Sequence, residues 1–465
     1  MASADVAIAS RRGGAWESVG LRRLTLLSIY WVAIGWLWNA LGAQVLPPVI
    51  TRMVGQAHQG TALSALEGFG TLVAVVWQPV VGALSDRTRL RWGRRRPYIA
   101  GGALGSSLFL VVMAFVGVYF WLLIVYFLLQ VASNTAQAPY QGLGPDAVPE
   151  KDFGKFGAFY GMGNLVGTLI GFLVTGIFTA SGQYGAALFA MAAMLVVSMV
   201  LTVTLVPDRG RPDSSLGMSV GEITLGTFQI SPHRHGDFLW LMGSRLLILM
   251  GVVGLETYAQ FFFKDVFYPH STNHANAATT YLLAIIVVLA IAVCYPAARL
   301  SDRWGRKPMV IVCAILGAVG ALGLVFSHYT LLPGMMTAPI ASLLGIPRGL
   351  AQVLWCGVPI GVGIGCFLTV DWAFMIDLIP PAETGRFLGF SNIATAGSGI
   401  IARFIAGPVL DHFNAGGHIL GELGGYPVVF GMFVVYFVAG IVLVLPVVEP
   451  RRRRTLNSAT SGTST

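Results

Sequence analysis

The stretch Gln78-Pro-Val-Val-Gly-Ala-Leu-Ser-Asp-Arg-Thr-Arg-Leu-Arg-Trp-Gly-Arg-Arg-Arg-Pro-Tyr-Ile99 joins two apolar segments through a loop rich in arginine. The arginines of this stretch are Arg87, Arg89, Arg91, Arg94, Arg95 and Arg96. A cluster of positive charge beside an apolar segment resists transfer across a bilayer, so it marks the cytoplasmic end of a membrane span. The stretch therefore predicts a membrane protein whose chain turns back on the cytoplasmic side at this loop.

The same pattern returns in the second half of the chain. Leu300-Ser-Asp-Arg-Trp-Gly-Arg-Lys-Pro308 repeats the Ser-Asp-Arg and Trp-Gly-Arg elements, and Ser301 follows Ser85 by 216 residues in a chain of 465. A second pair of segments, Asp146–Phe156 and Asp377–Phe387, shares Asp, Pro, Gly, a cation and Phe in the same order. The two repeats predict a duplicated protein built of two similar halves.

The composition is that of a chain dissolved in lipid. Hydrophobic residues make up 55% and charged residues only 11%, whereas soluble domains carry about a quarter charged residues. The net charge of +9 is concentrated in short loops, so it predicts topology and argues against nucleic-acid binding. The cysteines fall within apolar segments without metal-ligand spacing, so we interpret them as small buried hydrophobic residues and expect neither disulfides nor a metal site. They are Cys294, Cys313, Cys356 and Cys366.

Apolar segments of roughly 20 residues, the length of a membrane-spanning helix, recur along the chain. The twelve segments lie near residues 22–48, 61–84, 98–117, 120–144, 156–180, 184–206, 237–262, 276–299, 309–328, 353–377, 386–409 and 426–446. Lys and Arg are concentrated in alternate loops, which predicts that both termini are cytoplasmic. We therefore expect an all-α membrane protein of twelve transmembrane helices in two six-helix pseudo-repeats.

This pattern divides the chain into five parts. We expect a cytoplasmic tail without a cleavable signal peptide at 1–21, a six-helix bundle at 22–206, a cytoplasmic linker at 207–236, a second six-helix bundle at 237–446 and a disordered cytoplasmic tail at 447–465. Between two spans of the second half, Thr330–Gln352 is half apolar, and we expect a loop there, with a short interfacial helix as the alternative. Two parallel six-span halves are the build of a secondary transporter whose site lies between them.

The arginine-rich loop resembles that of a known family. Gly82-x-Leu-x-Asp-Arg87 followed by Gly93-Arg-Arg95 is similar to the signature loop of the major facilitator superfamily. The whole stretch resembles that of the plant sucrose–proton symporters and their bacterial and animal sugar-transporter relatives, in the glycoside–pentoside–hexuronide cation symporter group. Val131-Ala-Ser-Asn-Thr-x-Gln-x-Pro139 is similar to the plant symporters' Asp-Val-Ala-Asn-Asn-x-x-Gln-Gly-Pro. The resemblance implies the major facilitator fold and transport of a mono- or disaccharide, such as sucrose or maltose.

The chain departs from that resemblance at the position of the family's proton-binding aspartate. This position is Gln130 here, and the arginine that the family has a little further on is Gln141. A glutamine side chain cannot change its charge, so proton coupling through Gln130 is excluded. Coupling to a proton would need another group.

The repeated loops carry candidate gate residues. Asp86 and Asp302 each follow the end of a span and precede several cations, so we expect a charge-assisted network with neighbouring helix ends. Such a network holds one face of the protein shut and breaks when that face opens, and the alternative is a topology signal without a gating role. The candidate gate residues are Asp86, Arg87, Gly93, Arg94, Arg95, Asp302, Arg303 and Arg306.

Five ionisable residues fall within the predicted spans, namely Glu67, Arg245, Glu256, Asp371 and Arg403. A charge at the bilayer centre costs roughly 2.5–3.5 kcal/mol, so each needs a partner or an aqueous cavity. At about 1.5 Å per residue, Arg245 and Asp371 lie ~12 and ~9 Å from the cytoplasmic ends of their spans, and Glu256 and Arg403 lie at ~28 and ~25 Å. These depths predict the pairs Arg245–Asp371 and Arg403–Glu256.

Asp371 is the first candidate for proton coupling, because the resemblance implies that its span lines the cavity. A carboxylate in a low-dielectric site can bind and release a proton near cellular pH. Glu67 is the second candidate. The alternative for Asp371 is a fixed salt bridge that only orients helices.

Amide and aromatic side chains on the spans that the resemblance implies line the cavity are candidate sugar ligands. Hydroxyl groups of a sugar need polar partners, and aromatic rings stack on its apolar face. Gln130 lies near the expected midplane, where transporter sites are found. The candidate substrate-binding residues are Asn39, Gln130, Asn134, Gln137, Tyr140 and Trp372.

The sequence favours secondary active transport of a small polar solute, with a sugar as solute and a proton as a potential partner. Two alternatives stay open: a proton-coupled exporter of amphipathic compounds, and a non-transporting receptor or scramblase on the same fold. The ionisable residues lack any nucleophile–base spacing, so the sequence argues against an enzyme, and it predicts no cofactor. We expect a monomer in the bilayer of the cell membrane, either plasma or inner.

Overall fold

The computed structural model of the chain describes residues 20–88, 90–148, 153–206, 208, 235–379, 384–416 and 423–449, with a few helical residues described by their backbone only. All regular structure in these ranges is helical. Most of the expected linker and of both tails lies outside the described residues, as do the side chains of Asp86 and Arg87.

The first half of the chain begins with a span made of three helical pieces. These are α2 (Leu21–Ala40), the π-helical segment η1 (Leu41–Val45) and α3 (Leu46–Val54). A short 3₁₀ turn, η2 (Gln56–His58), then leads into the remaining helices of this half. They are α4 (Gln59–Arg87), α5 (Arg96–Met113), α6 (Tyr119–Ala147), α7 (Phe153–Ala180) and α8 (Tyr184–Leu205).

The second half repeats this plan with one added helix. Its elements are α10 (Gly236–Phe262) continued by the π-helical η4 (Phe263–Phe267), α11 (Thr272–Trp304), α12 (Arg306–Val325), α13 (Gly334–Leu344), α14 (Arg348–Leu378), α15 (Thr384–Gly416) and α16 (Tyr426–Val444). In both halves the first span contains a π-helical segment, inside the span in the first half and at its end in the second. Such segments are rare and are frequent at functional sites.

Most of the predicted spans agree with the observed helices. Within the described residues, eleven helices are long and apolar enough to cross a membrane. The predicted span at 386–409 lies within α15, a helix of 33 residues that is not among these eleven. A twelfth crossing and the cytoplasmic position of the termini therefore stay predictions.

The expected loop at Thr330–Gln352 is wrong in part, because its middle forms the helix α13. This helix has 11 residues, too few to cross a bilayer. Gly345 ends it with a left-handed backbone conformation at φ 63°, the usual C-terminal signal of a helix. Apolar side chains at both of its ends are exposed, with Met335 at 80% and Leu343 at 83%. The short helix named as the alternative is therefore the better description of the middle of this segment, and its position at the membrane interface stays a prediction.

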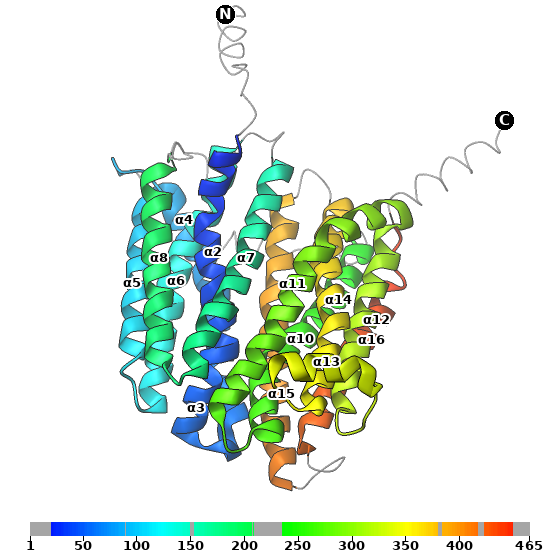
Figure 1. Cartoon of the computed structure of the whole chain (residues 1–465). Coiled ribbons are helices and arrows are strands. Elements are labelled where there is room, and N and C mark those ends of the chain that lie inside the picture. The colour runs from blue at the N-terminus through cyan, green and yellow to red at the C-terminus, as the bar shows by residue number, and fades with distance from the viewer. Residues whose placement is uncertain are drawn as a thin grey trace, which may run out of the picture.

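The two halves lie side by side, with α2 to α8 in blue to green on the left of Figure 1 and α10 to α16 in green to red on the right. We call the end of the bundle where α2 begins the basic face, because it carries the loop with Arg94 and Arg95; it is the upper end in Figure 1. We call the other end, where α3 ends, the opposite face. Between the halves, α4 packs along α15 and α7 packs along α11.

Glycines at every fourth residue of α7 let this helix lie against α2. Gly163, Gly167 and Gly171 share one face, and a β-carbon at any of them would come within 3.0 Å of an atom of α2. At Gly167 it would collide with the backbone oxygen of Val32. Small residues at this spacing allow close approach of helices within a membrane, where van der Waals packing replaces the hydrophobic effect.

The second half has an equivalent glycine face on α14. A β-carbon at Gly361 would lie 2.7 Å from the backbone oxygen of Ile286, and one at Gly365 would lie closer still to that of Ala290, both on α11. The chain therefore uses one packing device twice, once in each half.

Candidate functional site

A cavity of about 210 Å³ lies between the two halves. The first half contributes side chains of α2 and α7 to its wall, and the second half contributes α10, α11 and α14, with single residues of α12 and α16. Most of the lining is aliphatic or aromatic. The polar lining residues are Asn39, Asn164, Thr168 and Glu256. Because both halves form the wall, relative movement of the halves would reshape this cavity.

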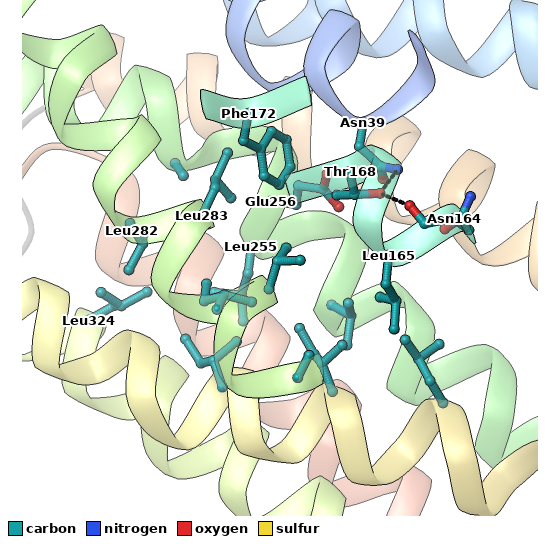
Figure 2. A pocket seen from close by; sticks show the side chains of 18 of the residues that line it. Asn39, Asn164, Leu165, Thr168, Phe172, Leu255, Glu256, Leu282, Leu283 and Leu324 are labelled. Atoms are coloured by element: carbon teal, nitrogen blue, oxygen red, sulfur yellow. Dashed lines mark hydrogen bonds between the residues drawn. The ribbon is translucent and has the colours of Figure 1, made fainter. Parts of the chain in front are cut away.

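The polar side chains of the first half form one corner of the cavity (Figure 2). Asn39 Nδ2 donates to Thr168 Oγ1 at 2.8 Å, and Thr168 Oγ1 donates to the backbone oxygen of Asn164 at 2.9 Å. Asn39 Nδ2 also donates to the backbone oxygen of Gly35 at 2.9 Å. No described residue donates a hydrogen bond to Asn39 Oδ1, so this oxygen is available to accept one from a solute.

This corner exists because α2 and α7 approach closely. Gly35 lies against Asn164, where a β-carbon would be 2.5 Å from the Asn164 backbone oxygen. Asn164 and Thr168 are four residues apart on α7, so they share one face of the helix. The sequence analysis named Asn39 but missed these two residues. Their spacing within an otherwise apolar span was the available signal.

Glu256 on α10 is the one carboxylate among the residues that line the cavity. It is partly exposed, and its exposure is toward the cavity. Among the described residues, no hydrogen bond or direct ion pair to this carboxylate is found. Arg403 and Glu67 are nonetheless close enough to interact with it electrostatically.

The predicted pair Arg403–Glu256 is not the direct ion pair in the structure. Arg403 Nε on α15 instead lies 2.6 Å from Glu67 Oε2 on α4, so this ion pair joins the two halves. The depth comparison was sound but did not consider Glu67, whose span runs antiparallel to that of Arg403. Depth alone also cannot say toward which neighbour a side chain points around the helix axis.

Arg245 on α10 and Asp371 on α14 form an ion pair through Nη1 and Oδ2, the partners that their depths predicted. Both side chains are nearly inaccessible, at 10% and 3%. The guanidinium also donates from Nη2 to Thr395 Oγ1 on α15 at 3.0 Å. This cluster ties three helices of the second half together, and neither charged residue lines the cavity.

The candidate sugar ligands on α6 are engaged elsewhere. Asn134 accepts a hydrogen bond from Gln78 Nε2 at 2.6 Å and donates to Gln130 Oε1 at 3.1 Å, and Gln130 in turn donates to Tyr126 Oη at 3.2 Å. This chain of amides links α4 to α6 within the first half. Gln130, Asn134 and Gln137 do not line the cavity.

Two aromatic candidates also lie away from the cavity. Tyr140 is buried, donates from its hydroxyl to the backbone oxygen of Leu27 at 2.6 Å, and stacks with Trp31 and Tyr160. Trp372 is 45% exposed and follows Asp371 on α14, outside the cavity lining. Of the six candidate ligands, Asn39 alone belongs to this cavity.

The loop after α4 at the basic face is held by a residue that the sequence analysis missed. Asp208, just beyond α8, accepts the backbone N–H of Arg95 at 2.7 Å and of Arg96 at 3.3 Å, which are at the start of α5. Gly93 turns the chain with φ 113°, and a β-carbon there would collide with Asp208. Carboxylates stabilise helix N-termini because the first N–H groups lack partners within the helix.

The second half contains the same device. Glu449, just beyond α16, accepts the backbone N–H of Lys307 at the start of α12 at 2.6 Å. Gly305 adopts φ 100° beside the Glu449 carboxylate. The two Gly-Arg loops are therefore anchored to the last helix of their own half.

An ionic network involves part of the predicted gate. Arg306 Nη2 lies 3.0 Å from Asp302 Oδ1 and Arg306 Nε lies 3.4 Å from Asp377 Oδ2 at the end of α14. Arg303 is exposed. The corresponding Asp86 and Arg87 side chains lie outside the described residues.

On the opposite face, polar contacts cross between the halves. Asp411 of α15 accepts the backbone N–H groups of Gly60 and Thr61 at 3.0 and 2.7 Å, which are in the first turn of α4. Ser64 Oγ lies 2.9 Å from Tyr258 Oη on α10.

Asp265 extends these contacts toward the surface. It accepts from Gln56 Nε2 at 2.6 Å, from Gln59 Nε2 at 2.8 Å and from Tyr426 Oη at 2.6 Å. Together with the Glu67–Arg403 pair, these contacts join the halves between the cavity and the opposite face.

Comparisons with known proteins agree with this architecture. The family model described as Major Facilitator Superfamily matches residues 23–402. The solved structure of the nucleoside transporter NupG superposes with a TM-score of 0.67 over 92% of this chain and 99% of that chain, at 14% sequence identity. At this identity the likeness concerns the fold alone.

Two curated relatives are similar in sequence over parts of the chain. A class H tetracycline resistance protein of Pasteurella multocida is 23% identical over 289 residues, which are 60% of this chain and 67% of that protein. A sucrose transport protein of Oryza sativa subsp. japonica is 36% identical over 97 residues, which are 21% of this chain and 17% of that protein. The family match covers most of the chain and the helices have the corresponding arrangement, so this multi-pass membrane protein belongs to the Major Facilitator Superfamily and is a transporter.

Proposed function

We propose that the protein carries a small sugar, a mono- or disaccharide, across the cell membrane by exposing the cavity between its halves to one side and then to the other. The observation that carries the proposal is the composition of the cavity wall. Asn39, Asn164 and Thr168 gather on the side of the first half, and aliphatic and aromatic side chains cover most of the side of the second half, where Glu256 is the one polar residue.

A sugar has matching surfaces. Its hydroxyl groups exchange hydrogen bonds with amide and hydroxyl side chains, and its C–H face packs on apolar side chains such as Phe172 and Phe262 in the wall. A buried polar group that is left without a partner costs free energy, so a wall with a polar corner selects a solute with hydroxyl groups at that corner. The partial likeness to a sucrose transport protein supports the same solute class.

The size of the cavity favours a small solute. At about 210 Å³ it is smaller than the roughly 300–1,000 Å³ of pockets that hold drug-sized ligands. This favours the monosaccharide end of the range.

We also propose the orientation and the state of the molecule. The arginines of the basic face favour a cytoplasmic position for that face by the positive-inside rule. The contacts of Asp411, Asp265, Ser64 and Glu67 close the opposite face, so the cavity would exchange solute with the cytoplasm in this state.

A second candidate function is export of an amphipathic compound. The likeness to a tetracycline resistance protein extends over 60% of the chain, and most of the cavity lining is apolar. This candidate predicts a larger and more apolar solute than the first.

A ligand screen followed by flux measurements tests the proposal. Thermal unfolding of the purified protein is recorded with a panel of mono- and disaccharides and with a panel of hydrophobic cations, and a stabilising compound is then assayed for flux in proteoliposomes. We expect stabilisation by a sugar. Stabilisation by hydrophobic cations and by no sugar would favour the exporter.

Two variants connect the result to the cavity. Asn39→Ala removes an amide from the cavity wall. We expect this variant to need at least about tenfold more sugar for the same rise in unfolding temperature, which corresponds to a loss of about 1.4 kcal/mol in binding free energy. Gln137→Ala removes an amide from outside the wall and serves as the matched control. An equal loss of stabilisation by sugar in both variants would indicate that the sugar binds closer to α6 than we propose.

A further inference from the structure

We propose that Glu256 is a proton-binding site that decides which carboxylate holds Arg403, and thereby whether the opposite face is closed. The inference rests on the proposed transport function, because a transporter must open and close each face in turn and proton binding would control one of these steps. It differs from the sequence-based candidates for coupling, Asp371 and Glu67.

The first observation is an excess of negative charge at the cavity. Glu67 and Glu256 share one nearby guanidinium, that of Arg403. Arg403 lies in direct contact with Glu67, and the other elements that form the cavity wall contribute no charged side chain to it. Two carboxylates and one guanidinium leave one negative charge without compensation beside a largely apolar cavity, and Glu256 is the one of the three that lines it. An uncompensated charge in such surroundings is costly. Binding of one proton to Glu256 removes this cost.

The second observation is the position of the three groups in the halves. Arg403 on α15 and Glu256 on α10 belong to the second half, whereas Glu67 on α4 belongs to the first. The pair Arg403–Glu67 therefore bridges the halves, but a pair Arg403–Glu256 would not. A guanidinium that moves from one carboxylate to the other makes or breaks a bond between the halves.

The sign of the effect follows from this geometry. When Glu256 holds a proton it is neutral, so Arg403 pairs with Glu67 and the opposite face is closed, as in the structure. When Glu256 loses the proton to the aqueous cavity, its carboxylate competes for Arg403 and weakens the bridge. The fraction of molecules with a closed opposite face should therefore fall as the pH rises through the range in which Glu256 loses its proton.

Other titratable groups face the cluster and belong to the same electrostatic unit. Tyr126 of α6 and Tyr258 of α10 lie in the field of both Glu67 and Arg403, and Asp411 acts on Tyr258. Tyrosines are neutral at cellular pH, and Asp411 accepts two backbone N–H groups of α4. We therefore assign the proton to Glu256, the carboxylate of this set that lines the cavity.

Asp371 is a weaker candidate for the same role. Its carboxylate is in direct contact with Arg245 within the second half, so loss or gain of a proton there breaks no contact between the halves. It also does not line the cavity.

The experiment measures the distance across the opposite face without any solute. Gly117, between α5 and α6, and His328, just beyond α12, are exposed residues at the opposite face, one in each half. Cysteines at these positions, in a full-length chain whose native cysteines are replaced by alanine, carry spin labels, and the distance distribution is recorded in lipid nanodiscs from pH 5 to pH 9.

We expect a short distance at low pH and a growing population of longer distances as the pH rises. Glu256→Gln mimics the protonated state and should give the short distance at every pH. Glu67→Gln removes the bridge and should give the long population at every pH. Glu256→Asp keeps a titratable group and should retain a pH response, and Asp371→Asn should respond like the unsubstituted chain.

Several outcomes would overturn the proposal. They are a distribution that does not change with pH, a Glu256→Gln variant that still responds to pH, and an Asp371→Asn variant that does not. A change produced at constant high pH by sodium but not by potassium would assign the site to a metal cation and reject the proton. Because no solute is used, a missing pH response leaves the sugar proposal intact, and failure of the sugar screen leaves this measurement valid.

Discussion

Asp208 Oδ2 accepts the backbone N–H of Arg95 at 2.7 Å, and this contact joins the end of the last helix of the first half to the start of α5. Glu449 makes the equivalent contact with Lys307 in the second half. The basic loops are thus fastened by acidic residues that are more than a hundred positions away in the chain.

Removal of either cap should destabilise its own half. Asp208→Ala leaves the first N–H groups of α5 without their acceptor, and Glu449→Ala does the same for α12. The loss of a helix cap costs about 0.5–2 kcal/mol, so we expect a lower temperature of unfolding in detergent for each variant. Asp208→Asn keeps an oxygen that can accept these hydrogen bonds, so its unfolding temperature should fall less than that of Asp208→Ala. Equal unfolding temperatures for Asp208→Ala and the unsubstituted chain would show that the contact carries no stability.

The buried pair Arg245–Asp371 should behave as a coupled unit. Asp371→Leu leaves the guanidinium of Arg245 without its carboxylate, and breaking a buried ion pair in this way costs about 3–5 kcal/mol. The double variant Arg245→Met with Asp371→Leu removes both charges and should be more stable than Asp371→Leu alone. Unfolding in mixed micelles with increasing denaturing detergent measures the free energy of unfolding of these two variants, of Arg245→Met alone and of the unsubstituted chain. Additive losses in the double variant would contradict direct pairing.

Close packing of α7 on α2 should tolerate no side chain at Gly167. An added methyl group there collides with the Val32 backbone, and overpacking of this kind costs about 1–3 kcal/mol. Gly161→Ala is the matched control on the same helix, because a β-carbon at Gly161 meets nothing within 4 Å. We expect Gly167→Ala to lower the unfolding temperature and Gly161→Ala to leave it unchanged or higher. The reverse order would mean that the two helices pack differently.

Asp411 should help to keep the opposite face closed. Its carboxylate caps α4 from the other half through Gly60 and Thr61, so Asp411→Ala should favour separation of the halves by about 1 kcal/mol. The reaction rate of a cysteine at the buried position of Ser64 with a maleimide reagent, in a chain without other cysteines, reports this opening. We expect the rate to rise several-fold in Asp411→Ala and less in Asp411→Asn. An unchanged rate in Asp411→Ala would show that this cap does not hold the face shut.

The sequence predicted the parts of the site that depend on one helix or on a repeat. The two Gly-Arg loops were found because they are duplicated, and Arg245 was matched with Asp371 because both depths could be counted from the same side of the membrane. The prediction that the amides on α6 line the solute cavity was wrong for this cavity, because Asn134 and Gln130 form a hydrogen bond with each other within the first half. A polar residue in a span indicates that a partner is needed but does not indicate which one. Asn164 and Thr168 were missed because each alone is ordinary in a span.

By itself, the sequence determined that this chain is a membrane protein of long apolar helices, that its two halves are related by duplication, and that one end of the bundle is basic. Those properties follow from composition and from residues that are near each other in the chain. Only the tertiary structure decided that Arg403 contacts Glu67, that Asp208 and Glu449 hold the basic loops, and that Glu256 lines the cavity. The rotation of each helix about its axis, which selects the neighbours of every side chain, is set by packing against helices that are distant in the sequence.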